Sequence, residues 1–301
     1  LQEVENIPSA PADGAEKENM IQKRGFCYMP TTYAHYKFGE EVMGALPRPL
    51  QTSIENKREL FDIGLHGPDI LFYYRPILKN KVNSQGYAMH DRPADEFFSR
   101  AADVIAKAED PAAARAYIYG FICHFALDSE CHPYVEKMIQ VSGISHSEIE
   151  MEFDRMLLTE DFLNPVRHDS AKHIHPTIEN GRVIAPFFEE VSPEIVKKAL
   201  KSMKFYLKIL RAPDPGKRRI LMGGMKLAYC YDSMHGMVMS LEPNPECKEY
   251  CALLKRRFSG AVPLAAGLIL QYQKKLFQGG ELPDRFHQTF GAGDHWEELR
   301  L

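Results

Sequence analysis

The sequence predicts an all-α protein folded as a multi-helix bundle. Apolar residues recur at the three- and four-residue spacing of helices along most of the chain, whereas the alternating pattern of strands is nearly absent. Near the middle, the segment AAARAYIYGFICHFAL is apolar on almost every face, which is typical of a helix at the centre of a bundle. We therefore expect helices packed around one central helix.

Capping and breaking residues place the individual helices. Thr31 or Thr32 can cap a first helix over 31–46, and a short charged helix over 52–64 ends near Gly64. Further helices are expected over 93–108, 111–130, 145 into the 150s, 192–211, 214–241 with a break at Gly223–Gly224, and 248–277.

Two stretches lack a clear helical pattern. Residues 65–92 contain Gly, Pro and Asn at short intervals and read as a long, mostly irregular connection, which in a compact domain usually carries function. Residues 164–190 are rich in loop-forming residues, with room for one short strand.

Composition narrows the class of protein. The 301 residues carry a net charge of −4 and a pI near 6.3, so no basic surface for a stable nucleic-acid complex is indicated. The six cysteines form no CxxC pair, which favours free thiols in a reducing compartment. Residues 1–28 lack the apolar core of a signal peptide, and no uninterrupted membrane-length apolar run occurs. We expect a disordered leader over 1–28, a single helical domain over 29–301 and a cytoplasmic location.

The most informative pattern is a series of side chains able to bind metal. His124, Asp128 and His132 recur every four residues, and His146 and Glu150 repeat that spacing on the next expected helix. Residues four apart share one face of a helix. Ionisable groups buried in so apolar a helix would cost several kcal/mol without partners, and a metal would supply those partners. The series predicts a metal-dependent hydrolytic site.

Zinc suits these ligand types because it binds imidazole and carboxylate groups and lowers the pKa of a bound water. Asp69 and His90, in the irregular stretch, can complete the ligand set. Two ions a few ångströms apart could then clamp a phosphate between them. We expect one ion at Asp69, His90, His124 and Asp128, and the other at His132, His146 and Glu150.

The arrangement resembles the zinc-dependent phospholipase C family and, more distantly, the zinc-dependent single-strand nucleases of fungi and plants. The resemblance covers roughly residues 29–160. In that family one buried helix carries His, Asp and His, and the next helix carries His-x-x-x-Glu or His-x-x-x-Asp about fourteen residues later. The separation of His132 from His146 agrees with this spacing. The upstream aspartate, histidine and N-terminal histidine of the family correspond to Asp69, His90 and His35.

The resemblance implies a helical bundle that hydrolyses phosphodiesters at a trinuclear zinc centre. Asp69 would double as general base, and Asp128 would bridge two metals. In the family, however, the third zinc is held partly by the first residue of the mature chain, whereas His35 lies thirty-four residues inside this one. A chain starting at Pro30, after removal of Met29, would place its amino group near His35. We therefore expect two zinc ions, and a third if the chain start supplies its ligands.

Other polar and aromatic residues have plainer interpretations. His66 is a weaker ligand candidate than Asp69, and the aromatic run at 72–74 either packs in the core or lines a substrate cleft. We expect His168, His173 and His175 to lie in a surface loop or in a lid that contacts substrate. His235, His287 and His295 are expected to be structural, and Glu152 and Asp154 to be solvated carboxylates.

The leading hypothesis is a phosphodiester hydrolase of phospholipase C type, in which a metal-activated hydroxide attacks phosphorus. A phosphodiesterase acting on a soluble nucleotide or glycerophosphodiester is one alternative, and a non-catalytic metal-binding helical protein is another. The third is disfavoured because a structural zinc site closes with four ligands, whereas seven or eight are present here. Peripheral contact with a membrane is compatible with the first hypothesis, and the oligomeric state is not indicated.

Overall fold

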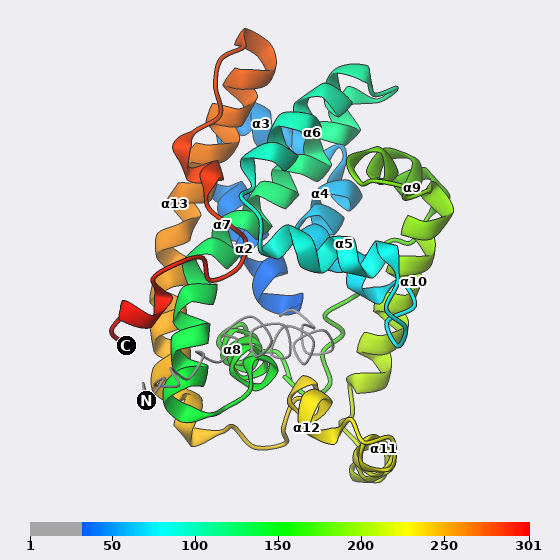
Figure 1. Cartoon of the computed structure of the whole chain (residues 1–301), viewed down its shortest axis with the longest axis vertical. Helices are drawn as coiled ribbons and strands as arrows, with labels where there is room; N and C mark the ends of the chain where they lie inside the picture. Colours follow the sequence, from blue (N-terminus) through cyan, green and yellow to red (C-terminus); the bar gives the residue numbers. More distant parts are fainter. Residues whose placement is uncertain (1–31) are drawn as a thin grey trace, which may run out of the picture.

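The computed structural model describes residues 32–301, which fold into twelve α-helices joined by short 3₁₀ turns (Figure 1). These residues form no strand, and the all-α prediction is confirmed. The leader expected over 1–28, and with it Met29 and Pro30, lies outside the described residues. No helix among those described is long and apolar enough to span a bilayer. The helices are α2 (Thr32–Ala45), α3 (Arg48–Glu55), α4 (Arg58–Gly64), α5 (Lys81–His90), α6 (Asp95–Lys107), α7 (Pro111–Ser142), α8 (His146–Glu160), α9 (Ile178–Ile184), α10 (Pro193–Leu210), α11 (Pro215–Leu227), α12 (Tyr231–Met234) and α13 (Lys248–Gln278).

The central helix is α7, which is packed against α2, α4, α6, α8 and α13. Its N-terminus is set by Asp110, whose side chain accepts a hydrogen bond from the backbone N–H of Ala113. We predicted that it would end at residue 130, but it continues through Pro133 and ends before Gly143, whose φ of 72° closes the last turn. Proline removes only one helical hydrogen bond, and burial of the following turns keeps the helix intact.

Helix α4 lies unusually close to α7. A Cβ atom on Gly64 would lie 2.1 Å from the carbonyl oxygen of Tyr117, and one on Gly120 would lie 2.1 Å from that of Phe61. Only glycine allows the two backbones to approach this closely. The close crossing places the turn after α4, which leads to Asp69, directly beside α7.

The stretch over 65–92 is more regular than the sequence predicted. It contains the 3₁₀ helix η1 (Gly67–Tyr73) and α5, whose start is stabilised by a capping box between Asn80 and Asn83. The helix expected over 52–64 is in fact the pair α3 and α4, separated by a turn. Helix α5 was missed in the sequence because asparagine residues that cap a helix are also typical of loops.

Two further expectations were wrong. The stretch over 164–190 contains α9 and no strand. Gly223 and Gly224 do not interrupt α11, because both adopt ordinary helical geometry on an exposed face. The chain leaves the helix a few residues later, at Tyr229, where φ is 54°.

The C-terminal tail completes the main core. Phe286 and Phe290 are buried, and Phe125 of α7 lies between them with ring centroids 5.4 and 5.1 Å away. A separate small core of Leu210, Ala212, Met225, Met237 and Val238 holds α11 and α12 at one end of the molecule. Figure 1 shows α12 between α8 and α11 at this end.

Candidate metal centre

All eight side chains proposed as ligands converge on one buried region beside α7. Seven of these residues are exposed by 8% or less, and His90 is the most open, with 13% of its side chain exposed. They come from five elements: His35 on α2, Asp69 on η1, His90 on α5, His124, Asp128 and His132 on α7, and His146 and Glu150 on α8. Three groups of three candidate ligands each place their ligand atoms within 4.8 Å of one another. The first group is Asp69, His90 and His124, the second is His132, His146 and Glu150, and the third is His35, His124 and Asp128.

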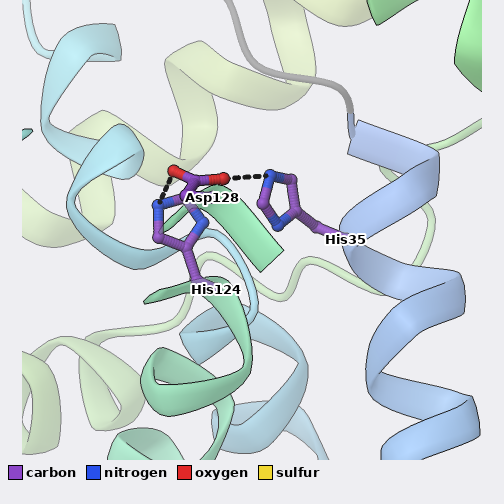
Figure 2. A group of neighbouring side chains, drawn as sticks. All are labelled: His35, His124 and Asp128. Carbon is purple, nitrogen blue, oxygen red and sulfur yellow. Dashed lines mark ion pairs between the residues drawn. The ribbon is translucent and has the colours of Figure 1, made fainter. Parts of the chain in front are cut away.

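Asp128 lies at the middle of the centre, between two imidazole rings (Figure 2). Its Oδ1 is 3.3 Å from Nε2 of His35, whereas its Oδ2 is 3.0 Å from Nε2 of His124. Oδ2 also lies 3.8 Å from Nε2 of His90. Burial raises the pKa of Asp128, but the surrounding imidazoles outweigh it and hold the pKa well below its usual range. The two oxygens face different imidazoles, an arrangement that suits a bridging carboxylate.

The first group joins η1, α5 and α7. Asp69 Oδ1 is 3.1 Å from Nε2 of His90, and Asp69 Oδ2 is 3.7 Å from Nε2 of His124. His90 donates from Nδ1 to the carbonyl oxygen of Gly86 at 2.9 Å, one turn back on its own helix. This hydrogen bond fixes the ring so that Nε2 points at the carboxylates, the arrangement commonly found for metal-binding histidines.

The second group joins α7 and α8. Glu150 Oε1 is 3.2 Å from Nε2 of His146 and 3.6 Å from Nε2 of His132. His132 donates from Nδ1 to the carbonyl oxygen of Phe290 at 2.8 Å, so the C-terminal tail orients this ring. On the far side of His146, Nδ1 lies 3.7 Å from Oε1 of Glu136. Both imidazoles therefore present Nε2 to the same space.

The charges in the second group are strongly coupled. Burial lowers the pKa of His132, but Asp128 and Glu150 more than compensate and raise it to about 9. Burial likewise lowers the pKa of His146, while Glu150 and Glu136 raise it to about 10. In return, the two imidazoles overcome the effect of burial on Glu150 and lower its pKa to about 2. The carboxylates thus create a field that favours a cation at this position.

The third group adds only His35 to residues already used. The ring of His35 stacks on that of His124, with centroids 4.5 Å apart. His35 is positioned by Asp154, whose carboxylate oxygens accept hydrogen bonds from the backbone N–H groups of Tyr33 and Ala34 at 3.1 and 2.8 Å. Such a cap fixes the first turn of α2, and therefore the direction of His35. A ligand from Pro30 lies outside the described residues.

Buried polar atoms that lack a well-aligned hydrogen bond indicate that the centre suits a metal. Both oxygens of Asp69 and both nitrogens of His124 are buried and make no hydrogen bond. Leaving such atoms unsatisfied is expensive, and a bound cation satisfies carboxylate and imidazole ligands together. Nitrogen and oxygen ligands of these types are those that zinc takes in hydrolytic sites. The residues present therefore fit the ion.

Gly67 makes room for the ring of His124. A Cβ atom at this position would lie 2.2 Å from Cδ2 of His124, and the φ of Gly67 is 48°. Both the space and the left-handed backbone require glycine. The first turn of η1 can therefore lie against the imidazole and bring Asp69 to it.

Two expectations about neighbouring carboxylates were wrong. Asp154 and Glu152 are 4% and 5% exposed, rather than solvated. Asp154 caps α2, and Glu152 pairs with Arg155 at 3.1 Å and accepts a hydrogen bond from the backbone of Asn244. The four-residue step from Glu150 to Asp154 was an available signal, because it continues the buried face of α8.

His173 also differs from the surface position predicted for it. It is 8% exposed, its Nε2 lies 2.8 Å from Nε2 of the fully buried His66, and its ring stacks on Tyr36. Burial lowers the pKa of His173 to about 3, with Lys204 adding to the effect. One neutral ring therefore donates to the other. The partners lie 107 residues apart in sequence, and no local pattern links them.

The aromatic run beside Asp69 is mainly core. Phe72 and Tyr73 are buried, and Phe72 stacks on Tyr87 with centroids 4.2 Å apart. Phe72 also lies against His90, with ring centroids 5.4 Å apart. Tyr74 is half-buried. Core packing is therefore the correct interpretation for the first two residues, and Phe72 supports α5, which carries the candidate ligand His90.

Fold and site together define a class of protein: an all-helical bundle with a buried, multi-ligand centre suited to metal. The model of the family described as zinc dependent phospholipase C matches residues 34–202, more than half of the chain and including all eight side chains. The chain belongs to this family, and the family predicted from its sequence is confirmed. No match was found among curated proteins or solved structures. Family and site together support a zinc-dependent, phospholipase-like hydrolase.

Proposed function

We propose that the protein hydrolyses phosphodiesters in the manner of a phospholipase C, with a phospholipid as substrate. The main support is the convergence of eight ligand-type side chains, among which the buried carboxylate of Asp69 has no hydrogen-bond partner. Membership of the phospholipase C family implies that the substrate is a phosphodiester. A cytoplasmic location and the lack of a stable nucleic-acid complex, both predicted from the sequence, remain part of this proposal.

The residues would divide among the zinc ions as the three groups suggest. A third ion at His35 and Oδ1 of Asp128 would need ligands from outside the described residues. When bound, zinc would supply an acidified water and positive charge opposite the phosphate oxygens. The first ion would be held by Asp69, His90, His124 and Oδ2 of Asp128, and the second by His132, His146 and Glu150.

Asp69 is the residue we assign to proton transfer. Its carboxylate is 1% exposed and lies beside the imidazoles of His90 and His124, so an oxygen can accept the proton that the attacking water loses. The new bond forms between the water oxygen and phosphorus, the bond from phosphorus to the alcohol oxygen breaks, and the proton taken up by Asp69 would pass to the departing alcohol oxygen. Asp128 would have a different role: its two oxygens face His35 and His124, so it would bridge two neighbouring ions.

A substrate panel tests the function. The protein would be assayed with added zinc and with chelator on a chromogenic phosphodiester, phosphatidylcholine and single-stranded DNA, while elemental analysis counts the zinc. We expect chelator-sensitive hydrolysis of the first two and two or three zinc ions per chain. Hydrolysis confined to soluble diesters or DNA would replace the phospholipid assignment, and zinc binding without any turnover would indicate a non-catalytic protein.

A pair of variants tests the role of Asp69. Asp69→Asn should lower turnover of the chromogenic diester by about 10²–10⁴-fold, the usual contribution of a general base, and by more if zinc is also lost. Asp91→Asn is a matched control, because this exposed carboxylate follows the ligand His90 directly but belongs to none of the three groups. Equal activity of Asp69→Asn and the wild type would refute the assignment.

A further inference from the structure

The surface of α11 carries large apolar side chains that the fold does not use. Ile220 and Leu227 are 78% and 83% exposed, and Tyr229, just beyond the helix, is 98% exposed. Seven residues make nearly two full turns, so Ile220 and Leu227 project from the same face of α11. Isolated exposed apolar residues need no explanation, but three on one short segment do.

No side chain fills the helix surface between Ile220 and Leu227. Gly223 and Gly224 lie between Ile220 and Leu227, and a Cβ atom on either glycine would meet nothing within 4 Å. On the opposite face, Met225 is buried in the small core with Met237. Helix α11 is therefore anchored by one side only. Its outer face is an apolar ridge that a flat surface can approach along its length.

Basic residues surround this ridge. Lys217, Arg219 and Lys226 are exposed on α11 itself. Residues 193–230, which include α10, contain ten Lys and Arg but only two acidic residues, although the whole chain has a net charge of −4. The exposed face of α10 likewise combines an apolar side chain with basic residues, because Phe205, 58% exposed, lies among lysines. Such a segregation of positive charge indicates an anionic partner.

We propose that α11 and Tyr229 form a docking surface for anionic phospholipid bilayers. A helix that lies in the membrane interface combines an apolar face with flanking Lys and Arg, and both features are present on α11. The apolar ridge would enter the boundary between headgroups and acyl chains, while the cations would bind acidic headgroups. Residues 215–229 lie beyond residues 34–202, the segment that the family model matches.

The docking surface is connected to the candidate metal centre. The turn after α12 packs on the start of α8, where a Cβ atom on Gly236 would lie 2.8 Å from Oγ of Ser145. Ser145 precedes His146 and caps α8 by accepting a hydrogen bond from the N–H of Glu148. A membrane held at α11 would thus lie next to the helix that carries His146 and Glu150. This use of the surface, though not membrane binding itself, rests on the proposed function.

Vesicle sedimentation tests the proposal. The wild type should sediment with vesicles of phosphatidylcholine containing about one third phosphatidylserine, less with phosphatidylcholine alone, and less as NaCl rises from about 0.1 to about 0.5 M. The double variant Ile220→Ser/Leu227→Ser should bind about tenfold more weakly or worse, because it lacks the two apolar side chains that would enter the bilayer. Arg219→Glu/Lys226→Glu should weaken binding by a similar factor.

Phe277→Ser is the matched control. Phe277 is 64% exposed in the last turn of α13, at the opposite end of the molecule from α11 (Figure 1). This variant should sediment like the wild type. Failure of the wild type to bind phosphatidylserine vesicles, or unchanged binding by both double variants, would overturn the proposal. Self-association that the Ile220→Ser/Leu227→Ser variant abolishes, without vesicle binding, would assign the face to a second copy instead.

Turnover measured in parallel separates this proposal from the proposed function. Hydrolysis of the soluble chromogenic diester should be the same in Ile220→Ser/Leu227→Ser and the wild type, whereas hydrolysis of vesicle phospholipid should fall with binding. Normal turnover of the soluble diester without vesicle binding would refute the docking surface alone. Vesicle binding without chelator-sensitive turnover would refute the proposed function alone.

Discussion

Replacing Asp154 by asparagine should remove a pH dependence from the stability of the protein. Burial raises the pKa of Asp154 from its ordinary value of 3.8 to about 7, against the opposing effect of the N–H groups of Tyr33 and Ala34. Between pH 3.8 and about 7 the folded state therefore holds a proton that the unfolded state has lost. Unfolding in this range releases that proton, so the free energy of unfolding falls as pH rises. Well above pH 7 the Asp154 carboxyl is ionised in both states, and its effect on the free energy of unfolding no longer changes with pH.

The expected size follows from the two pKa values. One pKa unit corresponds to about 1.4 kcal/mol, so the change from 3.8 to about 7 amounts to about 4 kcal/mol as an upper limit. Asparagine has nearly the same shape but does not titrate. The unfolding free energy of the wild type minus that of Asp154→Asn should therefore fall by about 1.4 kcal/mol per pH unit up to pH 7, and then level off.

Urea unfolding of the metal-free proteins from about pH 5 to about pH 8 measures this difference, because other titrating groups are common to both chains. Glu160→Gln is the control: this exposed carboxylate, also on α8, pairs with Lys255 at 3.0 Å, and its variant should differ from the wild type by a constant amount. A difference for Asp154→Asn that stays constant within about 0.5 kcal/mol across this range would refute the reasoning.

Three further predictions concern the centre itself. Gly67→Ala should lower the free energy of unfolding by about 1–3 kcal/mol, because it strains the backbone and brings a Cβ atom against His124. Gly223→Ala, on an open helical face, should raise the free energy of unfolding by about 0.5–1 kcal/mol. Urea unfolding measures both changes, and equal effects of the two variants would contradict the packing described. His124→Ala should lose zinc and unfold at a lower temperature, and full zinc content by elemental analysis would rule out its role as a ligand. Glu136→Gln should weaken zinc binding about 10–100-fold in a chelator competition, because Glu136 supports the ring of His146; unchanged affinity would show that this contact is incidental.

The part of the centre that the sequence predicts best lies within single helices. His124, Asp128 and His132 share a face of α7 because four residues make about one helical turn, and this relation needs no knowledge of the rest of the fold. The same reasoning places His146 beside Glu150. The structure brings these residues together with Asp69, His90 and His35, although metal binding by each of them stays a prediction.

Most of the contacts that the sequence did not predict join segments that are distant in the chain. The position of Asp154 on α8 was visible, but only the packing of α2 against that helix shows that its carboxylate caps a second ligand-bearing element. The carbonyl of Phe290 offers no side-chain pattern at all, yet it orients His132 from 158 residues away. Asparagine capping of α5 was read as loop, because the same residues favour both structures.

The amino-acid sequence by itself determined the all-α class, and the types of candidate ligand and their spacing along α7 and α8, because helical periodicity and side-chain chemistry are local properties. Only the tertiary structure decided which ligands form a group, that the two oxygens of Asp128 face different imidazoles, and that α11 exposes an apolar ridge. These features depend on how helices distant in the chain pack together, and a local pattern carries no information about its distant neighbours.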